Sequence, residues 1–260
     1  MKGNCPQYLD YLNVPVALCQ YSLTVNKIAQ VKLYLYLKSN SNGYIKNEPS
    51  VYHRAANDLN VCLKTIRSHK NWLLKEGWLI YDSKVNSVKI ISFKNLAIKL
   101  AFPSASGVIL YKSEIQNYKG IAIAAIIEYY SMRLKRRNKV TELEKWSSQF
   151  PEYLRYPHLA HAYLAKVLNK SKTAIYKYKK HASRSKYIKI KKKYFDLQLA
   201  GNGIQYLKDY GPLNSDNIKR KGATIIYQLP DEIHCLVRLR RKEELRKICQ
   251  KNREGKIVYH

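Results

Sequence analysis

A spacing of small, aliphatic and capping residues occurs twice in this sequence, once from Ala56 and again 109 residues later from Ala165. The first copy consists of Ala56, Leu59, Asn60, Cys62, Thr65, Ile66 and Leu73, with Trp78 and Leu79 beyond it. The second copy consists of Ala165, Leu168, Asn169, Ser171, Ala174, Ile175 and Ala182, with Tyr187 and Ile188 beyond it. A register shared by two copies argues against coincidence, so we expect the same local structure to be built twice.

Each position in this spacing has a structural reason. A small alanine lets two helices approach closely, and an aliphatic residue in the turn fills the gap between them. A capping side chain accepts from the free N–H groups at the start of the second helix. An inward pair such as Thr65 and Ile66 packs that helix down and leaves its neighbours facing outward. The pattern therefore predicts two helices joined by a tight turn, with an exposed face on the second helix.

The residues around each copy extend this prediction to a small domain. Gly77 is typical of a helix end, and the two apolar runs that flank the polar turn 82–87 are typical of a β-hairpin. Around the first copy we expect helices over 27–38, from Pro49 to about Asp58 and from Leu63 to Glu76, then strands over 78–81 and 88–92. Around the second copy we expect helices over 121–134, 141–148, 158–168 and 171–183, then a hairpin within 187–199.

The order of helices and hairpin over about residues 25–95 resembles the winged-helix family, in which the hairpin is called the wing. Residues 77–79 match the start of a wing. Two positions depart from the family pattern: Cys62 stands where a capping serine is usual, and Lys70 stands where an inward aliphatic residue is more common.

The second copy resembles the same family more faintly, because Lys170 replaces the aliphatic turn residue and Lys186 replaces the wing glycine. Two such units in tandem resemble plasmid replication initiators of the two-winged-helix type, a comparison that rests on architecture alone. The resemblance implies a mainly α fold with small β-hairpin wings. Its expected parts are an N-terminal arm (1–24), winged-helix domain 1 (25–100), a linker (101–118), winged-helix domain 2 (119–200) and a basic C-terminal extension (201–260). Within that extension we expect a strand from Thr224 to Leu229 and a basic helix from Asp231 to about Asn252.

The charge of the chain narrows the choice of partner. Lys and Arg number 48 against 18 Asp and Glu, a formal net charge of +30, and so large a charge repels itself unless a polyanion is bound. Nucleic acid is the first candidate and an acidic membrane surface the second, but the longest fully apolar run, 121–127, is far too short to span a membrane. The N-terminus lacks the apolar stretch of a signal peptide, so we expect a cytoplasmic, nucleoid-associated protein without membrane attachment.

The resemblance implies that the second helix of each unit enters the major groove of DNA, where its early outward residues reach the bases. Arg67 suits a guanine and Asn71 an adenine, whereas wing lysines suit phosphates, which position a protein without specifying sequence. The candidate DNA-binding residues of the first unit are Lys64, Arg67, Ser68, Asn71, Lys84 and Lys89. Those of the second unit are Lys172, Thr173, Tyr176, Lys177, Lys180, Lys189, Lys191, Lys192 and Lys193. The basic stretch 238–253 either follows phosphates or folds back on the second unit.

Signs of catalysis are sparse, and we expect neither an enzyme nor a cofactor. The chain has no G-x-x-x-x-G-K-[ST] phosphate loop, and its five cysteines include no C-x-x-C pair that would indicate a zinc site. His158 and His161 form a weak candidate metal pair, because no cysteine or carboxylate cluster accompanies them. Asp82 and Glu144 lie in fragments that resemble nuclease sites, but Mg²⁺ requires convergent carboxylates. The many tyrosines lack a recognisable His and Arg constellation that would make one a nucleophile.

These observations predict a sequence-specific double-stranded DNA-binding protein of a plasmid, phage or other mobile element, acting as a replication initiator or a transcription regulator. Two alternatives stay open: a protein that binds RNA, or any nucleic acid, through Tyr and Lys surfaces, and a DNA-processing enzyme. The sequence also leaves open a homodimer, since the second unit would serve equally as a dimerisation module.

Overall fold

The computed structural model describes residues 11–102, 106–140, 161–192, 194–196, 218–221, 224–228 and 232–241. Over these residues the chain is mainly helical with small antiparallel sheets, which confirms the expected fold class at this level. Within the same ranges no helix combines the length and the hydropathy needed to cross a membrane. The expected helix over 141–148 lies outside the described residues.

The first unit is built from three helices and a three-stranded sheet. Its elements are α2 (Ile28–Ser39), β2 (Tyr44–Lys46), α3 (Pro49–Leu59), α4 (Leu63–Lys75), β3 (Leu79–Asp82) and β4 (Ser87–Ile90). The helices and the β3–β4 hairpin lie where the sequence predicted them. Strand β2 was not predicted, because only Ile45 among its three residues turns inward and so short a segment has no periodicity to detect. It pairs with β4, which gives the sheet order β2-β4-β3.

The second unit repeats the helices but completes its hairpin differently. Its elements are α6 (Tyr118–Val140), α9 (His161–Leu168), α10 (Lys172–Arg184), β6 (Ile188–Lys191) and β10 (Glu232–Cys235). Strand β6 pairs with β10, with Ile190 opposite Ile233. The expectation that 187–199 folds into a hairpin on itself is therefore wrong: the return strand comes from a distant part of the chain.

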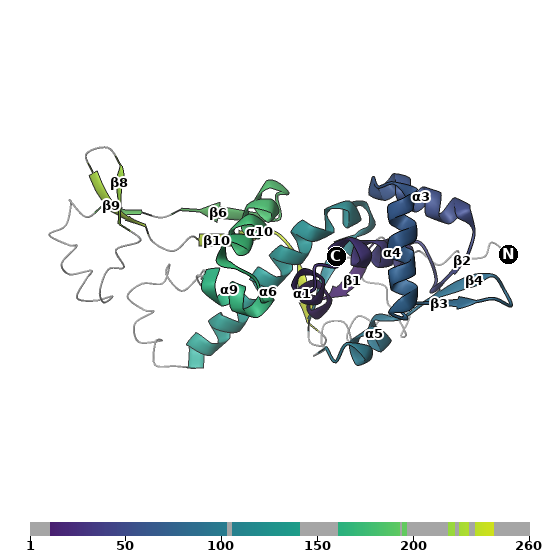
Figure 1. Ribbon diagram of the computed structural model, residues 1–260. Helices are drawn as coiled ribbons and strands as arrows, with labels where there is room; N and C mark the ends of the chain where they lie inside the picture. Colours follow the sequence, from purple (N-terminus) through teal and green to yellow (C-terminus); the bar gives the residue numbers. More distant parts are fainter. Residues whose placement is uncertain are drawn as a thin grey trace, which may run out of the picture.

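A small sheet is inserted between β6 and β10. It contains β7 (Tyr194–Asp196), β8 (Ile218–Lys221) and β9 (Thr224–Gln228) in the order β7-β9-β8. Strand β9 confirms the strand predicted from Thr224. In Figure 1, β8 and β9 lie at one end of the molecule, and the sheet of the first unit lies at the other end, with α6 between them.

A third sheet joins segments that the sequence analysis kept apart. It contains β1 (Tyr11–Pro15), β5 (Ser106–Tyr111) and β11 (Leu239–Arg241), with β5 in the middle. The stretch 101–118, expected to be a linker, thus contains a buried strand and the 3₁₀ helix η1 (Lys112–Asn117). The basic helix expected from Asp231 is replaced over 232–241 by two strands, because both partners of those strands offer edges for pairing. The expected arm contains β1 and the helix α1 (Val16–Thr24).

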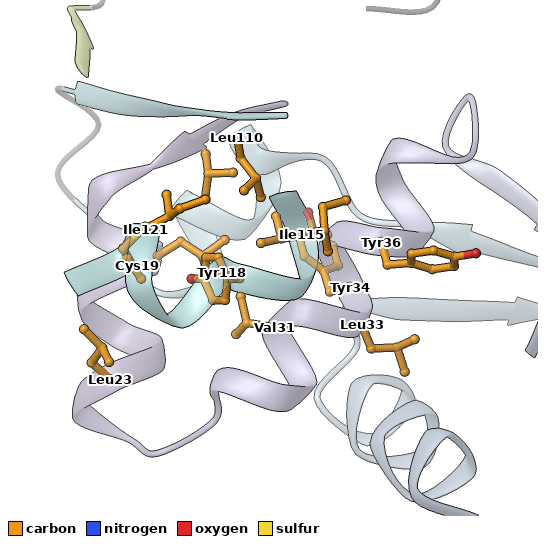
Figure 2. Close-up of a cluster of buried hydrophobic side chains, with 14 of the residues drawn as sticks. Cys19, Leu23, Val31, Leu33, Tyr34, Tyr36, Leu110, Ile115, Tyr118 and Ile121 are labelled. Carbon is orange, nitrogen blue, oxygen red and sulfur yellow. The ribbon is translucent and has the colours of Figure 1, made fainter. Parts of the chain in front are cut away.

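The start of α6 is anchored in the core of the first unit. Tyr118 is fully buried, and its hydroxyl lies 3.1 Å from Ser22 Oγ of α1. Figure 2 shows Tyr118 among Cys19, Val31 and Ile121, which come from α1, α2 and α6. Burial raises the pKa of the Cys19 thiol to about 12, so this sulfur is an inert apolar packing group at neutral pH. The two units therefore share one hydrophobic core. The remaining helix, α5 (Phe93–Lys99), follows the first hairpin.

Candidate nucleic-acid interface

The first helix pair, α3 and α4, is joined by a turn that one left-handed residue makes possible. Helix α3 ends at Leu59, and Asn60 then adopts φ +52°, a conformation that asparagine tolerates better than most residues. The turn lets Val61 N donate to Ala56 O at 3.0 Å. Cys62 begins α4 in an extended conformation, and its side chain makes no capping hydrogen bond.

The second helix pair, α9 and α10, has the same turn 109 residues later. Asn169 adopts φ +48°, and Lys170 N donates to Ala165 O at 2.9 Å. Ser171 starts α10 in the same extended conformation as Cys62, but its Oγ accepts from Ala174 N at 3.2 Å. The second turn therefore keeps the backbone of the first and adds the helix cap that the first one lacks.

The correspondence continues to the end of each second helix and into the strand after it. Helices α4 and α10, and then β3 and β6, begin and end at residues 109 apart. Gly77 and Lys186 hold the same position after the helix with φ of +63° and +61°. Trp78 N donates to Leu73 O at 2.8 Å, and Tyr187 N donates to Ala182 O at 3.0 Å in the second copy. The lysine at 186 therefore occupies a conformation that favours glycine.

The inner faces of both second helices are packed as the spacing predicts. Ile66 and Ile175 are buried at corresponding positions. Each helix also turns one lysine inward. Lys70 Nζ donates to Asn47 Oδ1 at 2.7 Å and lies over the ring of Tyr52, and Lys179 at the corresponding position is buried. The inward lysine is thus a shared property of both copies.

The outward faces carry the residues expected to contact DNA. All four candidates on α4 and all five on α10 are exposed: Lys64, Arg67, Ser68, Asn71, Lys172, Thr173, Tyr176, Lys177 and Lys180. Exposure is what a DNA contact requires, and the contact itself stays a prediction. Tyr176 also lies beside His161, with the ring centroids 6.5 Å apart.

The wing candidates are exposed wherever the structure describes them. They are Lys84, Lys89, Lys189, Lys191 and Lys192, whereas Lys193 lies outside the described residues. The β3–β4 hairpin also exposes the apolar or aromatic side chains of Ile80, Tyr81 and Val85 beside its lysines. Strand β10, which pairs with β6, was missed because nothing in the segment 187–199 points to residues 232–235 as its partner.

Hydrogen bonds hold the two helix pairs in a fixed relation. Gln20 Nε2 of α1 donates to Val167 O of α9 at 3.1 Å, and Tyr130 Oη of α6 donates to Gln20 Oε1 at 3.0 Å. Tyr187 Oη, just after α10, donates to Glu114 Oε1 of η1 at 3.3 Å. These bonds attach the second unit to α1 and η1, and both of these elements pack against α2 of the first unit, so α4 and α10 are presented by one body.

A cleft of about 440 Å³, lined by both aliphatic and cationic side chains, lies between the two helix pairs. Its lining includes His69 of α4 and His181 of α10, together with Lys119 at the start of α6. Sequence reasoning missed this site for a clear reason. In the repeat register His69 corresponds to Tyr178 and His181 corresponds to Trp72, so only the packing of the units brings the two imidazoles to one cleft.

Among the candidate catalytic groups, Asp82 has an ordinary structural role. Asp82 Oδ1 accepts from Lys84 N at 3.0 Å in the exposed wing turn. His158 and Glu144 lie outside the described residues. Among those that are described, no three His, Cys, Asp or Glu side chains gather in a way that would hold a metal ion.

Comparisons with protein-family models, with curated proteins and with solved structures returned no match. The functional argument for this chain therefore stands on its own residues: two matching helix pairs, their exposed faces, and the cleft between them.

Proposed function

We propose that this chain is a sequence-specific double-stranded DNA-binding protein that presents two winged-helix units in tandem. The observation that carries the proposal is the repeat of turn, second helix and following strand at one offset, with a polar and basic exposed face on both second helices. A helix of this kind fits the major groove of B-DNA, and its exposed side chains then reach base edges and phosphates.

The two faces suit different parts of the duplex. Arg67 and Asn71 on α4 are able to make paired hydrogen bonds to guanine and adenine, respectively. The lysines of α10 act as point charges, which suit phosphates. We infer that the first unit reads sequence and that the second adds affinity and fixes the register.

The biological role that we propose is replication initiation or transcription regulation for a plasmid, phage or other mobile element. Its support is the tandem arrangement, which resembles two-winged-helix initiators in architecture alone. Binding to a repeated array of sites would favour the initiator, whereas binding to a single operator would favour the regulator.

Exposed aromatic rings favour a second candidate, a protein that stacks on single-stranded nucleic acid. Tyr44, Tyr81 and Tyr176 have exposed fractions of 58%, 49% and 57%. Stacking on such rings is tolerant of sequence and works on unpaired bases. The same binding experiment separates this candidate from the first.

The test is a competition assay with the full chain across a range of salt concentrations. Labelled duplex DNA competes with the same sequence as single-stranded DNA and as RNA. We expect duplex DNA to bind most tightly, with a salt slope that corresponds to about six or more phosphates. Tighter binding of single strands would overturn the proposal in favour of the stacking protein. The Lys94→Gln variant, which changes an exposed lysine of α5 away from both helix pairs, is the control.

A further inference from the structure

The cleft between the helix pairs is formed by six different elements, α2, α3, α4, η1, α6 and α10. One wall comes from α2 and α4 and the other from α10, while η1 and the start of α6 supply Gln116, Asn117 and Lys119. In Figure 1, α4 and α10 lie on either side of the start of α6. The cleft therefore sits between the two helices whose outward faces we propose to contact DNA.

The charged groups at the cleft are mainly cationic. Burial is the main cause that lowers the pKa of His69, and the positive charges of Lys27 and Lys32 lower it further. Burial also lowers the pKa of Lys32, so its ammonium group gains from any anion that approaches. The carboxylate of Asp58, near the end of α3, accepts a hydrogen bond from Tyr36 and is not among the residues that line the cleft.

The opposite wall repeats this arrangement. Burial is again the main cause that lowers the pKa of His181, and the positive charges of Lys119 and Arg184 add to it. Glu114 of η1 accepts a hydrogen bond from Tyr187. Two imidazoles from different units thus share a cleft where positive charge disfavours their protonation until an anion enters.

We propose that this cleft binds a phosphate group, with His69 on one wall and His181 on the other. The inference rests on the proposed function, in which the phosphate belongs to the DNA backbone where it passes from α4 to α10. A bound phosphate dianion or diester accepts hydrogen bonds from the imidazoles and from Lys119, and its charge favours the protonated imidazoles. Binding is therefore accompanied by proton uptake.

The coupling between phosphate binding and imidazole protonation determines how the affinity changes with pH. Each histidine titrates below its ordinary pKa of 6.5 in the free chain and at a higher pH when phosphate is bound. Affinity then rises as pH falls through the bound-state pKa and levels off below the free-state pKa. A shift of one pH unit at one imidazole corresponds to about a tenfold change in affinity.

The experiment follows the ring C2–H resonances of the histidines by NMR in the full chain between pH 5 and 8. Single His69→Gln and His181→Gln variants assign the two signals, and His53→Gln, which alters an exposed histidine of α3 outside the cleft, is the matched control. Titrations are recorded for the free chain, with inorganic phosphate, and with a duplex. We expect both midpoints to rise with phosphate-bearing ligands while that of His53 stays constant.

Duplex affinity supplies a second readout. From pH 7.5 to pH 5.5 we expect it to increase about tenfold or more in the wild type, and less than threefold in the double variant His69→Gln with His181→Gln. Unchanged midpoints with a bound duplex would overturn the inference and leave the proposed DNA binding intact. If no duplex binds, the proposed function fails, and the titration with inorganic phosphate then tests the cleft by itself. Higher midpoints of His69 and His181 with phosphate would support a site for free phosphate compounds, and unchanged midpoints would overturn the site.

Discussion

On the first helix pair, the exposed face of α4 presents Arg67 and Asn71, two types of side chain that are able to pair with base edges. On the second pair, the corresponding positions of α10 hold Tyr176 and Lys180, and more lysines surround them. The backbone beneath these faces is nevertheless the same in both pairs. The comparison teaches that a few inward and turn positions set the geometry, which leaves the outward positions free to differ in chemistry.

The largest expected effect tests the role of the second pair. Changing Lys172, Lys177 and Lys180 together to Gln should weaken duplex binding about 100-fold at physiological salt and reduce the salt slope by about three. The loss should be similar for every sequence, because we propose that these lysines contact phosphates. Binding titrations on two unrelated duplexes measure it, with Lys94→Gln plus Lys112→Gln as a control on exposed lysines elsewhere. A loss confined to one duplex would mean that α10 reads bases.

A smaller but more selective effect is expected from the first pair. Arg67→Ala should remove one preferred base position from the binding site and cost about 2 kcal/mol on the preferred duplex. Tyr176→Ala changes the corresponding residue of α10 and should leave base preference unaltered. Binding-site profiles of both variants check this division, and a profile that changes with Tyr176 but not with Arg67 would reverse it.

The start of α10 has a side-chain cap and the start of α4 has none, and measurements of the free energy of unfolding can test this difference. Ser171→Ala removes the hydrogen bond to Ala174 N and should lower the free energy of unfolding by about 1 kcal/mol. Cys62→Ser supplies a capping oxygen at the corresponding position and should raise it by about 0.5 kcal/mol. Urea unfolding of the full chain measures both. If Ser171→Ala destabilises the fold while Cys62→Ser leaves the free energy of unfolding unchanged or lowers it, the two turns are not equivalent.

The smallest effect concerns the residue after each second helix. Lys186→Gly should stabilise the fold by about 0.5 kcal/mol, because glycine adopts φ +61° without strain although it gains freedom in the unfolded chain. Gly77→Ala should do the opposite, and its Cβ would also lie 2.8 Å from Lys99 Nζ. Thermal unfolding compares the two variants, and a destabilised Lys186→Gly would show that the lysine side chain compensates for the backbone strain.

Sequence reasoning succeeded where structure is local. Helices α3, α4 and α10 follow from turn, cap and inward residues that lie within a few positions of one another, and the shared register supported both copies at once. The exposed faces follow from the same periodicity. The candidate DNA-binding residues therefore lie on surfaces that the sequence alone identified.

Sequence reasoning failed where partners are distant. Strand β5 was taken for a linker because Pro103 and Gly107 suggested a loop, whereas its partners lie near both ends of the chain. Strand β10 was taken for helix, although it pairs with β6 about 40 residues earlier. His69 and His181 meet at one cleft only because α6 packs against both units. Pairing and packing of this kind leave no periodic trace in the sequence.

The measurement that tests the central claim most directly is selection of bound duplexes from a random DNA pool with the full chain. If two units read one site, the selected duplexes will share a long or bipartite motif. In that case, Arg67→Ala will erase part of one half, and the triple lysine variant will weaken binding without changing the motif. Strong, steeply salt-dependent binding without any motif would contradict the account and indicate a non-specific nucleic-acid-binding protein.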